Sequence, residues 1–257
     1  MYKFQYSEFL NNCLKLYNES IQYSYIDNKL NKDRAIIAIN LIKVNNDMVN
    51  NVSSMMLSNN LPKEEIKRVN FMSEITTDIN HYISEIKGLN CKKVELSSLD
   101  LWPNIYGLES YGETLKYYHK NYQDESLYNI DLKTILLDNF DISKMVDNYQ
   151  GKSFLTSHGC IQVIQEKISL LGYLLVNVIN NDSIEVDDEE TLRKCLENYS
   201  NLSIEIKKYY QKGIKTESQA FSVLKEISPK ILELNEFVDT NLNISSKKFK
   251  DTKLISI

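Results

Sequence analysis

The sequence predicts an all-α fold: a multi-helix up-down bundle with long heptad-patterned helices and an irregular, aromatic-rich insertion. Only seven Gly and three Pro occur in 257 residues, whereas a β-sandwich or barrel needs turn residues about every ten positions. Apolar residues also recur at alternating steps of three and four, which is typical of helices that pack at shallow angles. Because no Pro/Gly/Ser-rich linker divides the chain, we expect residues 1–257 to form a single helical domain.

The most apolar part of the chain, residues 168–179, is interrupted only by Ser169 and Asn177. A helix that is apolar on nearly every side is typical of a protein core, and about a dozen residues are too few to cross a bilayer. The sequence therefore predicts a central core helix and no stable membrane span. Its packing seam is expected at Ile161, Ile164, Ile168, Leu171, Leu175 and Val178.

Three amphipathic helices are predicted in the first helical half, residues 1–87. The first lies within residues 3–26, and the second follows Asp33, whose side chain can cap its first turn. The third covers residues 62–87 and ends before Gly88.

The second helical half, residues 131–242, contains the central helix and continues the same pattern. Asp131 can cap a short helix at 132–139, and Asp141 can cap another that ends at about residue 149. The sequence Thr216–Gln219 is a capping box for the last helix. Because the apolar seam continues on both sides of Pro229, we expect a kink there and not a helix end. The Lys-rich tail, residues 243–257, has lost the pattern and is expected to fray.

Between the two halves, residues 88–130 form the predicted insertion. Trp102-Pro103, Gly107 and Gly112 interrupt the helical period, and only residues 113–122 suggest a short helix. We therefore expect irregular structure over most of this segment.

Aromatic residues are concentrated in this insertion. Tyr and Trp offer large, rigid contact areas with a polar tip and are enriched among binding hot spots. One interpretation is a protein-binding surface, and the other is that the rings cover an open edge of the bundle. The residues predicted for the binding surface are Trp102, Tyr106, Tyr111, Tyr117 and Tyr118.

One candidate metal site lies on the third predicted helix, where Glu74, Asp78, His81 and Glu85 share a stripe. Carboxylates and an imidazole on one stripe can bind a divalent metal, as in carboxylate-bridged bundles. However, at about 100° per residue this stripe lies away from the apolar one, so we expect it to face water. We predict no metal and no cofactor.

Signals for catalysis are weak. His158 and Cys160 lie at a helix start, where a thiolate can be stabilised, but no third orienting group can be assigned. The sequence has no Gly-rich phosphate loop, no Walker-type motif, no H-E-x-x-H and no G-x-S-x-G. These observations favour a non-enzymatic protein.

Composition and the N-terminal sequence indicate which partners and which cellular location to expect. The formal charge of −5 gives the chain no overall positive charge with which to bind a nucleic-acid phosphate backbone. The N-terminus has no apolar signal-peptide core. We therefore predict a cytoplasmic protein that binds no nucleic acid. The frequent Asn, Ile, Lys and Tyr are typical of an AT-rich bacterial or viral genome. The cysteines, which form no C-x-x-C pair and are expected to be reduced and mostly buried, are Cys13, Cys91, Cys160 and Cys195.

The predicted function is a non-enzymatic helical protein-binding module, such as a toxin-neutralising (immunity), adaptor or effector protein. Its predicted partner is another protein. One alternative is a metal-dependent helical-bundle enzyme that uses Glu74, Asp78 and His81. A further alternative is a membrane-active helical protein that exposes residues 168–179. The sequence is also compatible with a homodimer, because heptad seams can pair between chains.

Overall fold

The computed structural model describes residues 2–58, 61–86, 101–121, 125–139, 157–181, 186–213 and 216–242. The all-α prediction is confirmed, since eight α-helices account for most of these residues. They are α1 (Tyr6–Tyr23), α2 (Lys32–Leu57), α3 (Lys63–Glu85), α5 (Trp102–Asn121), α6 (Leu132–Asn139), α8 (Ser157–Asn181), α9 (Val186–Gln211) and α10 (Glu217–Asn241). The predicted helix at 141–149, the insertion residues 88–100 and 122–124 and the tail 243–257 lie outside the described residues.

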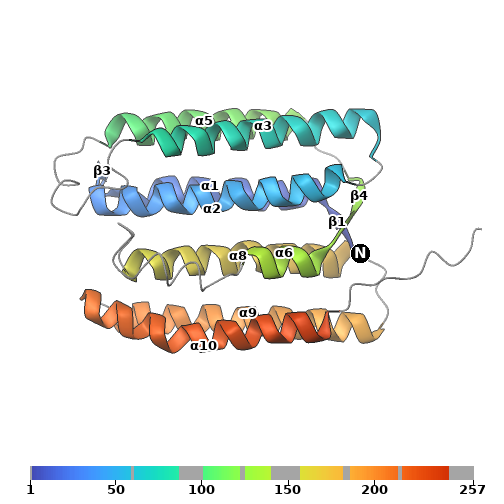
Figure 1. Cartoon of the computed structure of the whole chain (residues 1–257). Helices are drawn as coiled ribbons and strands as arrows, with labels where there is room; N and C mark the ends of the chain where they lie inside the picture. The colour runs from blue at the N-terminus through green and yellow to red at the C-terminus, as the bar shows by residue number, and fades with distance from the viewer. Residues whose placement is uncertain are drawn as a thin grey trace, which may run out of the picture.

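The helices lie side by side with nearly aligned axes, in stacked layers (Figure 1). α3 and α5 form one outer layer, and α9 and α10 form the other. The two inner layers consist of α1 with α2 and of α6 with α8. Contacts of α2 with α3 and α8, and of α8 with α9 and α10, connect these layers.

Helix α8 is buried in the core, as its apolar run predicts. All six predicted seam residues are buried, and Leu171, Leu175 and Val178 are 0% exposed. Within the described part of the chain, α8 is the one helix that is long and apolar enough to cross a membrane, judged by length and composition only. Because 61% of its most apolar window is buried inside the protein, the packing of α8 is that of a core helix.

A short antiparallel sheet joins the N-terminus to a distant part of the chain. β1 (Tyr2–Gln5) pairs with β4 (Leu127–Ile130), with Phe4 opposite Tyr128. The buried amide of Asn177 holds the end of β1, because its Oδ1 accepts from the Gln5 N–H at 2.8 Å and its Nδ2 donates to the Gln5 carbonyl at 2.9 Å. The polar interruption in the apolar α8 run therefore satisfies two backbone groups of a strand end.

The first predicted helix begins later than expected, because the predicted span 3–26 includes strand β1 and the two-residue strand β2 (Tyr25–Ile26). β2 pairs with β3 (Lys29–Leu30) in a hairpin whose turn residues, Asp27 and Asn28, have φ values of 48° and 60°. Asp and Asn tolerate this left-handed backbone better than most residues.

Helix capping is partly as predicted. Asp131 accepts from the Thr134 backbone N–H at 3.2 Å and so caps α6, and Thr216 forms the predicted capping box of α10. The cap of α2 was assigned to the wrong residue, since Asn31 and not Asp33 accepts the Arg34 N–H. Helix α10 continues past Pro229 and does not end there, as expected.

Candidate functional site on the outer face of α5

Helix α5 lies within the predicted irregular insertion, residues 88–130. It spans Trp102–Asn121, whereas the sequence suggested a helix only from residue 113 to 122. Pro103 is compatible with this helix because it occupies the first turn, where the backbone N–H has no intrahelical acceptor in any case. The expected irregularity is therefore wrong for residues 102–112, the short helix expected from residue 113 is confirmed as part of α5, and the aromatic residues are held on a regular helix.

The two glycines of α5 permit close packing and do not break the helix. A Cβ on Gly112 would approach Cε1 of Tyr17 to 2.9 Å, and a Cβ on Gly107 would collide with the Tyr82 ring. Tyr17 is buried, and its hydroxyl donates to the Leu108 carbonyl of α5 at 2.8 Å. Gly112 therefore allows α5 to approach α1 closely.

Replacement of Gly112 with Ala is expected to destabilise the fold by about 1–3 kcal/mol, because the buried Tyr17 ring cannot move away freely. This loss should outweigh the gain of up to about 1 kcal/mol that Ala gives an exposed helix interior. Gly172→Ala in α8 is the matched control, since a Cβ there meets no atom within 4 Å, and it should be neutral or stabilising. Urea denaturation measures both changes, and an unchanged stability of Gly112→Ala would contradict the packing argument.

The five predicted aromatic residues divide into two groups. Trp102, Tyr106 and Tyr117 are 51%, 66% and 67% exposed. Tyr111 and Tyr118 instead pack against the core. Two of the rings therefore cover the core, as one interpretation expects, and the other three are exposed.

The inward rings make defined contacts with α3. The Tyr111 ring lies 5.7 Å from that of Tyr82, and the Tyr118 ring lies 4.1 Å from that of Phe71, measured between ring centroids. These contacts fix the rotation of α5 about its axis. As a result, the opposite face of α5 points away from the bundle.

Trp102 is exposed, but its ring contacts Tyr25 of the β2–β3 hairpin. Its ring meets the edge of Tyr25 with a centroid distance of 6.2 Å, and the Tyr25 hydroxyl donates to Oε1 of Glu109 at 2.8 Å. Burial, together with this bond to Glu109, raises the pKa of Tyr25 to about 12. The phenol therefore keeps its proton at neutral pH and connects the β2–β3 hairpin to α5.

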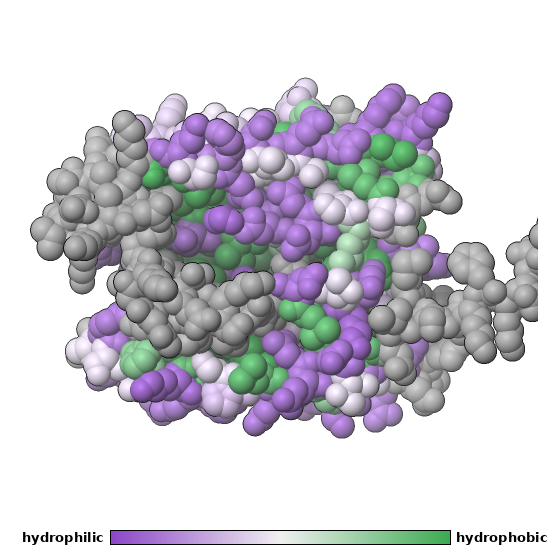
Figure 2. All heavy atoms as spheres, in the orientation of Figure 1, coloured by the Kyte–Doolittle hydropathy of each residue, from purple (hydrophilic) through white to green (hydrophobic). Residues whose placement is uncertain are grey.

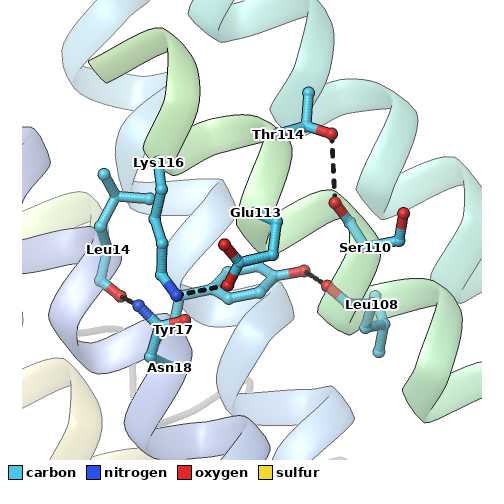
Figure 3. A network of polar contacts seen from close by, with 8 residues as sticks. All are labelled: Leu14, Tyr17, Asn18, Leu108, Ser110, Glu113, Thr114 and Lys116. Atoms are coloured by element: carbon cyan, nitrogen blue, oxygen red, sulfur yellow. Dashed lines mark hydrogen bonds and ion pairs between the residues drawn. The ribbon is translucent and has the colours of Figure 1, made fainter. Parts of the chain in front are cut away.

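A surface groove of about 620 Å³ lies between α1 and α5, beside Tyr106. Figure 3 shows the polar side chains that order this region: Asn18 bonds within α1, and Lys116 pairs with Glu113 within α5. The lining contains Glu109, Glu113 and Lys116 as its charged residues, so the carboxylates outnumber the ammonium group. The complete lining is Asn18, Ile21, Gln22, Tyr106, Glu109, Ser110, Glu113 and Lys116.

Sequence reasoning missed the groove. A signal was present, because Tyr106, Glu109 and Glu113 are spaced by three and four residues and share one helical face. This spacing indicates a shared face only if residues 102–112 are helical, and the sequence pattern predicts irregular structure there. The α1 side of the groove could not be found in this way, since no local pattern indicates which helix packs beside α5.

The candidate metal residues face solvent, as expected from their angular position. Glu74, Asp78, His81 and Glu85 are all exposed, and Nδ1 of His81 lies 3.5 Å from Oε1 of Glu85. Among the residues that the structure describes, no group of three or more His, Cys, Asp or Glu side chains is arranged to hold a metal ion.

His158 and Cys160 lack the chemistry of a nucleophilic pair. Burial raises the pKa of the Cys160 thiol to about 12, and burial lowers the pKa of His158. The His158 ring packs edge-on against Tyr210 at 5.4 Å. A thiol with so high a pKa stays protonated at neutral pH and is a poor nucleophile.

Comparison with protein-family models, with curated proteins and with solved structures finds no match to this chain. Its function must therefore be inferred from its own residues.

Proposed function

We propose that this protein is a non-enzymatic helical module that binds another protein through the outer face of α5. This face, called the α5 face below, consists of Trp102, Tyr106 and Tyr117. Its exposure is the observation that carries the proposal, because large aromatic side chains on a rigid helix are the residues that dominate protein interfaces.

Core packing does not account for the exposed parts of these three side chains. Tyr111 and Tyr118 already cover the core from the same helix, and they are the rings that contact α3. Removing the exposed part of Trp102 or Tyr106 from water requires a second surface. Figure 2 shows one side of the molecule, where apolar residues emerge as separate patches among hydrophilic ones, a distribution that suits small docking sites with polar rims.

Charge favours a cationic partner segment. The groove beside Tyr106 contains Glu109 and Glu113 against Lys116, and the whole chain carries a formal charge of −5. Complementary charge accelerates association and disfavours acidic partners. We therefore propose that the partner places a Lys/Arg-rich segment with apolar anchors in the groove and against the α5 face.

This proposal places the chain among toxin-neutralising (immunity), adaptor or effector proteins, which act by binding and need no catalytic centre. Cys13, Cys160 and Cys195 are free and buried, which is compatible with the reducing cytoplasm that we also propose as its location. A basic toxin domain would satisfy the charge argument.

A selection experiment tests the proposal even though the partner is unidentified. Random peptides displayed on phage are selected on the immobilised wild-type protein. We expect enrichment of sequences that combine Lys or Arg with aromatic or branched apolar residues. Enrichment of acidic sequences would refute the assignment. So would selected peptides that bind equally well to a variant in which the three side chains of the α5 face are truncated to Ala.

Truncation of Trp102, Tyr106 and Tyr117 to Ala should weaken the selected peptides by about thirtyfold or more, because buried aromatic anchors each contribute about 2 kcal/mol. Helical content should be nearly unchanged, since the inward rings remain. The matched control is a triple Ala variant of exposed apolar residues on α9 and α10, namely Ile204, Phe221 and Leu232. Calorimetric titration is run beside circular dichroism on both variants, and equal losses of affinity in the two would contradict the proposal.

A further inference from the structure

A second hollow, of about 460 Å³, opens on the α3 side of α5. We call it the α3–α5 pocket. Its size falls within the usual range for small-molecule sites, roughly 300–1,000 Å³. The lining comes from three helices and consists of Leu10 of α1, Glu64, Lys67, Arg68, Phe71 and Met72 of α3, and Tyr118 and His119 of α5.

The wall of the pocket contains a largely buried cation. Nη1 of Arg68 lies 3.3 Å from Oε2 of Glu65, and the two side chains are only 20% and 16% exposed, respectively. Lys67 and Glu64 form a second pair at 3.0 Å, but both of these side chains are well exposed. The lining contains Lys67 and Arg68 against Glu64, and with Glu65, the partner of Arg68, the charges around the pocket balance in a chain whose formal charge is negative.

His119 adds a neutral polar group to this wall. The side chain is buried, and burial lowers its pKa. The imidazole is therefore uncharged at neutral pH. In this form one ring nitrogen donates a hydrogen bond and the other accepts one.

The remaining walls are apolar. Leu10 and Met72 are buried core residues, and Phe71 and Tyr118 form a tilted aromatic pair with a centroid distance of 4.1 Å. Apolar and aromatic walls with a few convergent polar groups are the usual composition of a site for an organic ligand.

From this arrangement we infer that the α3–α5 pocket binds a small organic monocarboxylate with an aromatic body. The carboxylate meets the guanidinium of Arg68, and the ring packs against the wall formed by Phe71, Tyr118 and Met72. A monoanion fits better than a phosphate dianion, because Glu64 and Glu65 stand within one helical turn of Arg68 and would repel a second negative charge. This site is distinct from the α5 face and does not depend on the proposed protein partner.

Phenylacetate is a suitable probe, with phenylacetamide as its neutral isostere. Ligand-observed NMR with the full chain should give a Kd on the order of 1 mM for phenylacetate, in keeping with the affinity of very small ligands. We expect phenylacetamide to bind at least tenfold more weakly. Inorganic phosphate at the same concentration should not displace phenylacetate. Equal binding of the amide, or displacement by phosphate, would overturn the inference.

The variant Arg68→Gln should weaken phenylacetate at least tenfold. The matched control is Arg193→Gln on α9, which breaks another Arg–Glu pair, between Arg193 and Glu189, and should leave binding unchanged. If Arg68→Gln fails to fold, the wild-type protein is titrated with phenylacetate instead. The chemical shift of the Met72 methyl group should then change and reach a plateau as the pocket fills. A methyl resonance that stays in place at millimolar phenylacetate would overturn the proposal.

Discussion

Replacement of Leu171 or Leu175 with Ala should lower the free energy of unfolding by about 2–5 kcal/mol. Both side chains are 0% exposed in α8, and α8 contacts α1, α2, α9 and α10. Each substitution removes buried methyl groups and leaves a cavity that the surrounding helices fill only in part. A loss of this size is a large fraction of the total stability of an ordinary domain.

Chemical denaturation monitored by circular dichroism measures this effect. Val176→Ala, at an exposed position of the same helix, is the control and should change stability little. Midpoints of Leu171→Ala and Leu175→Ala that coincide with the wild-type midpoint would show that α8 is not the core of the fold.

The second large effect concerns the pH dependence of stability and the carboxyl group of Glu166 on α8. Its Oε1 is buried without a hydrogen-bond partner. Burial raises the pKa of Glu166 to about 8, and the nearby carboxylate of Glu19 on α1 adds to the increase. The ordinary pKa of Glu in an unfolded chain is about 4.3.

These two pKa values determine whether the free energy of unfolding rises or falls with pH. Below about pH 4.3 the carboxyl is protonated in both states, so its contribution to stability is fully present. As pH rises from about 4.3 to 8, the unfolded chain ionises while the folded protein keeps its proton. The free energy of unfolding therefore falls across this window, and the contribution is lost once pH passes the folded pKa.

Glu166→Gln, a neutral substitution of similar shape, should remove this dependence. At pH 8 we expect the variant to be more stable than the wild type by several kcal/mol, because the two pKa values differ by almost four units at about 1.4 kcal/mol per unit. At pH 5 the two should differ little. Glu74→Gln, on the exposed stripe of α3, is the control. Parallel pH profiles of wild type and Glu166→Gln, measured by thermal melting, would contradict the assignment.

The core could be predicted because its signal is local and periodic. Ile161, Ile168 and Leu175 are spaced by multiples of a helical turn, and all are buried. The same holds for Tyr6, Cys13 and Tyr17 on α1. In such segments the hydrophobic period alone determines both the helix and its buried face.

Helix α5 shows where local reasoning fails. Gly112 lowers helix propensity, but its missing side chain lets α5 approach Tyr17, and tertiary packing outweighs propensity. The sequence located the aromatic residues on this segment but not the direction in which each one points. Of the residues predicted for the binding surface, Tyr111 and Tyr118 pack their rings against α3.

Contacts between distant segments could not be predicted at all. Strand β1 forms because Phe4 pairs opposite Tyr128, and no pattern near the N-terminus indicates that partner. The α3–α5 pocket likewise joins Arg68 and His119 from different helices. Spacing along the chain carries no information about such pairs until the packing of the helices is known.

The fluorescence of Trp102 tests the central claim most directly, because the chain contains one Trp and it lies on the α5 face. In the free protein this side chain is 51% exposed and should be open to quenching by iodide. On addition of a selected cationic peptide we predict a blue shift and protection from iodide, both saturating at the concentrations that saturate binding. Emission and quenching that stay unchanged at full occupancy would show that the partner binds elsewhere.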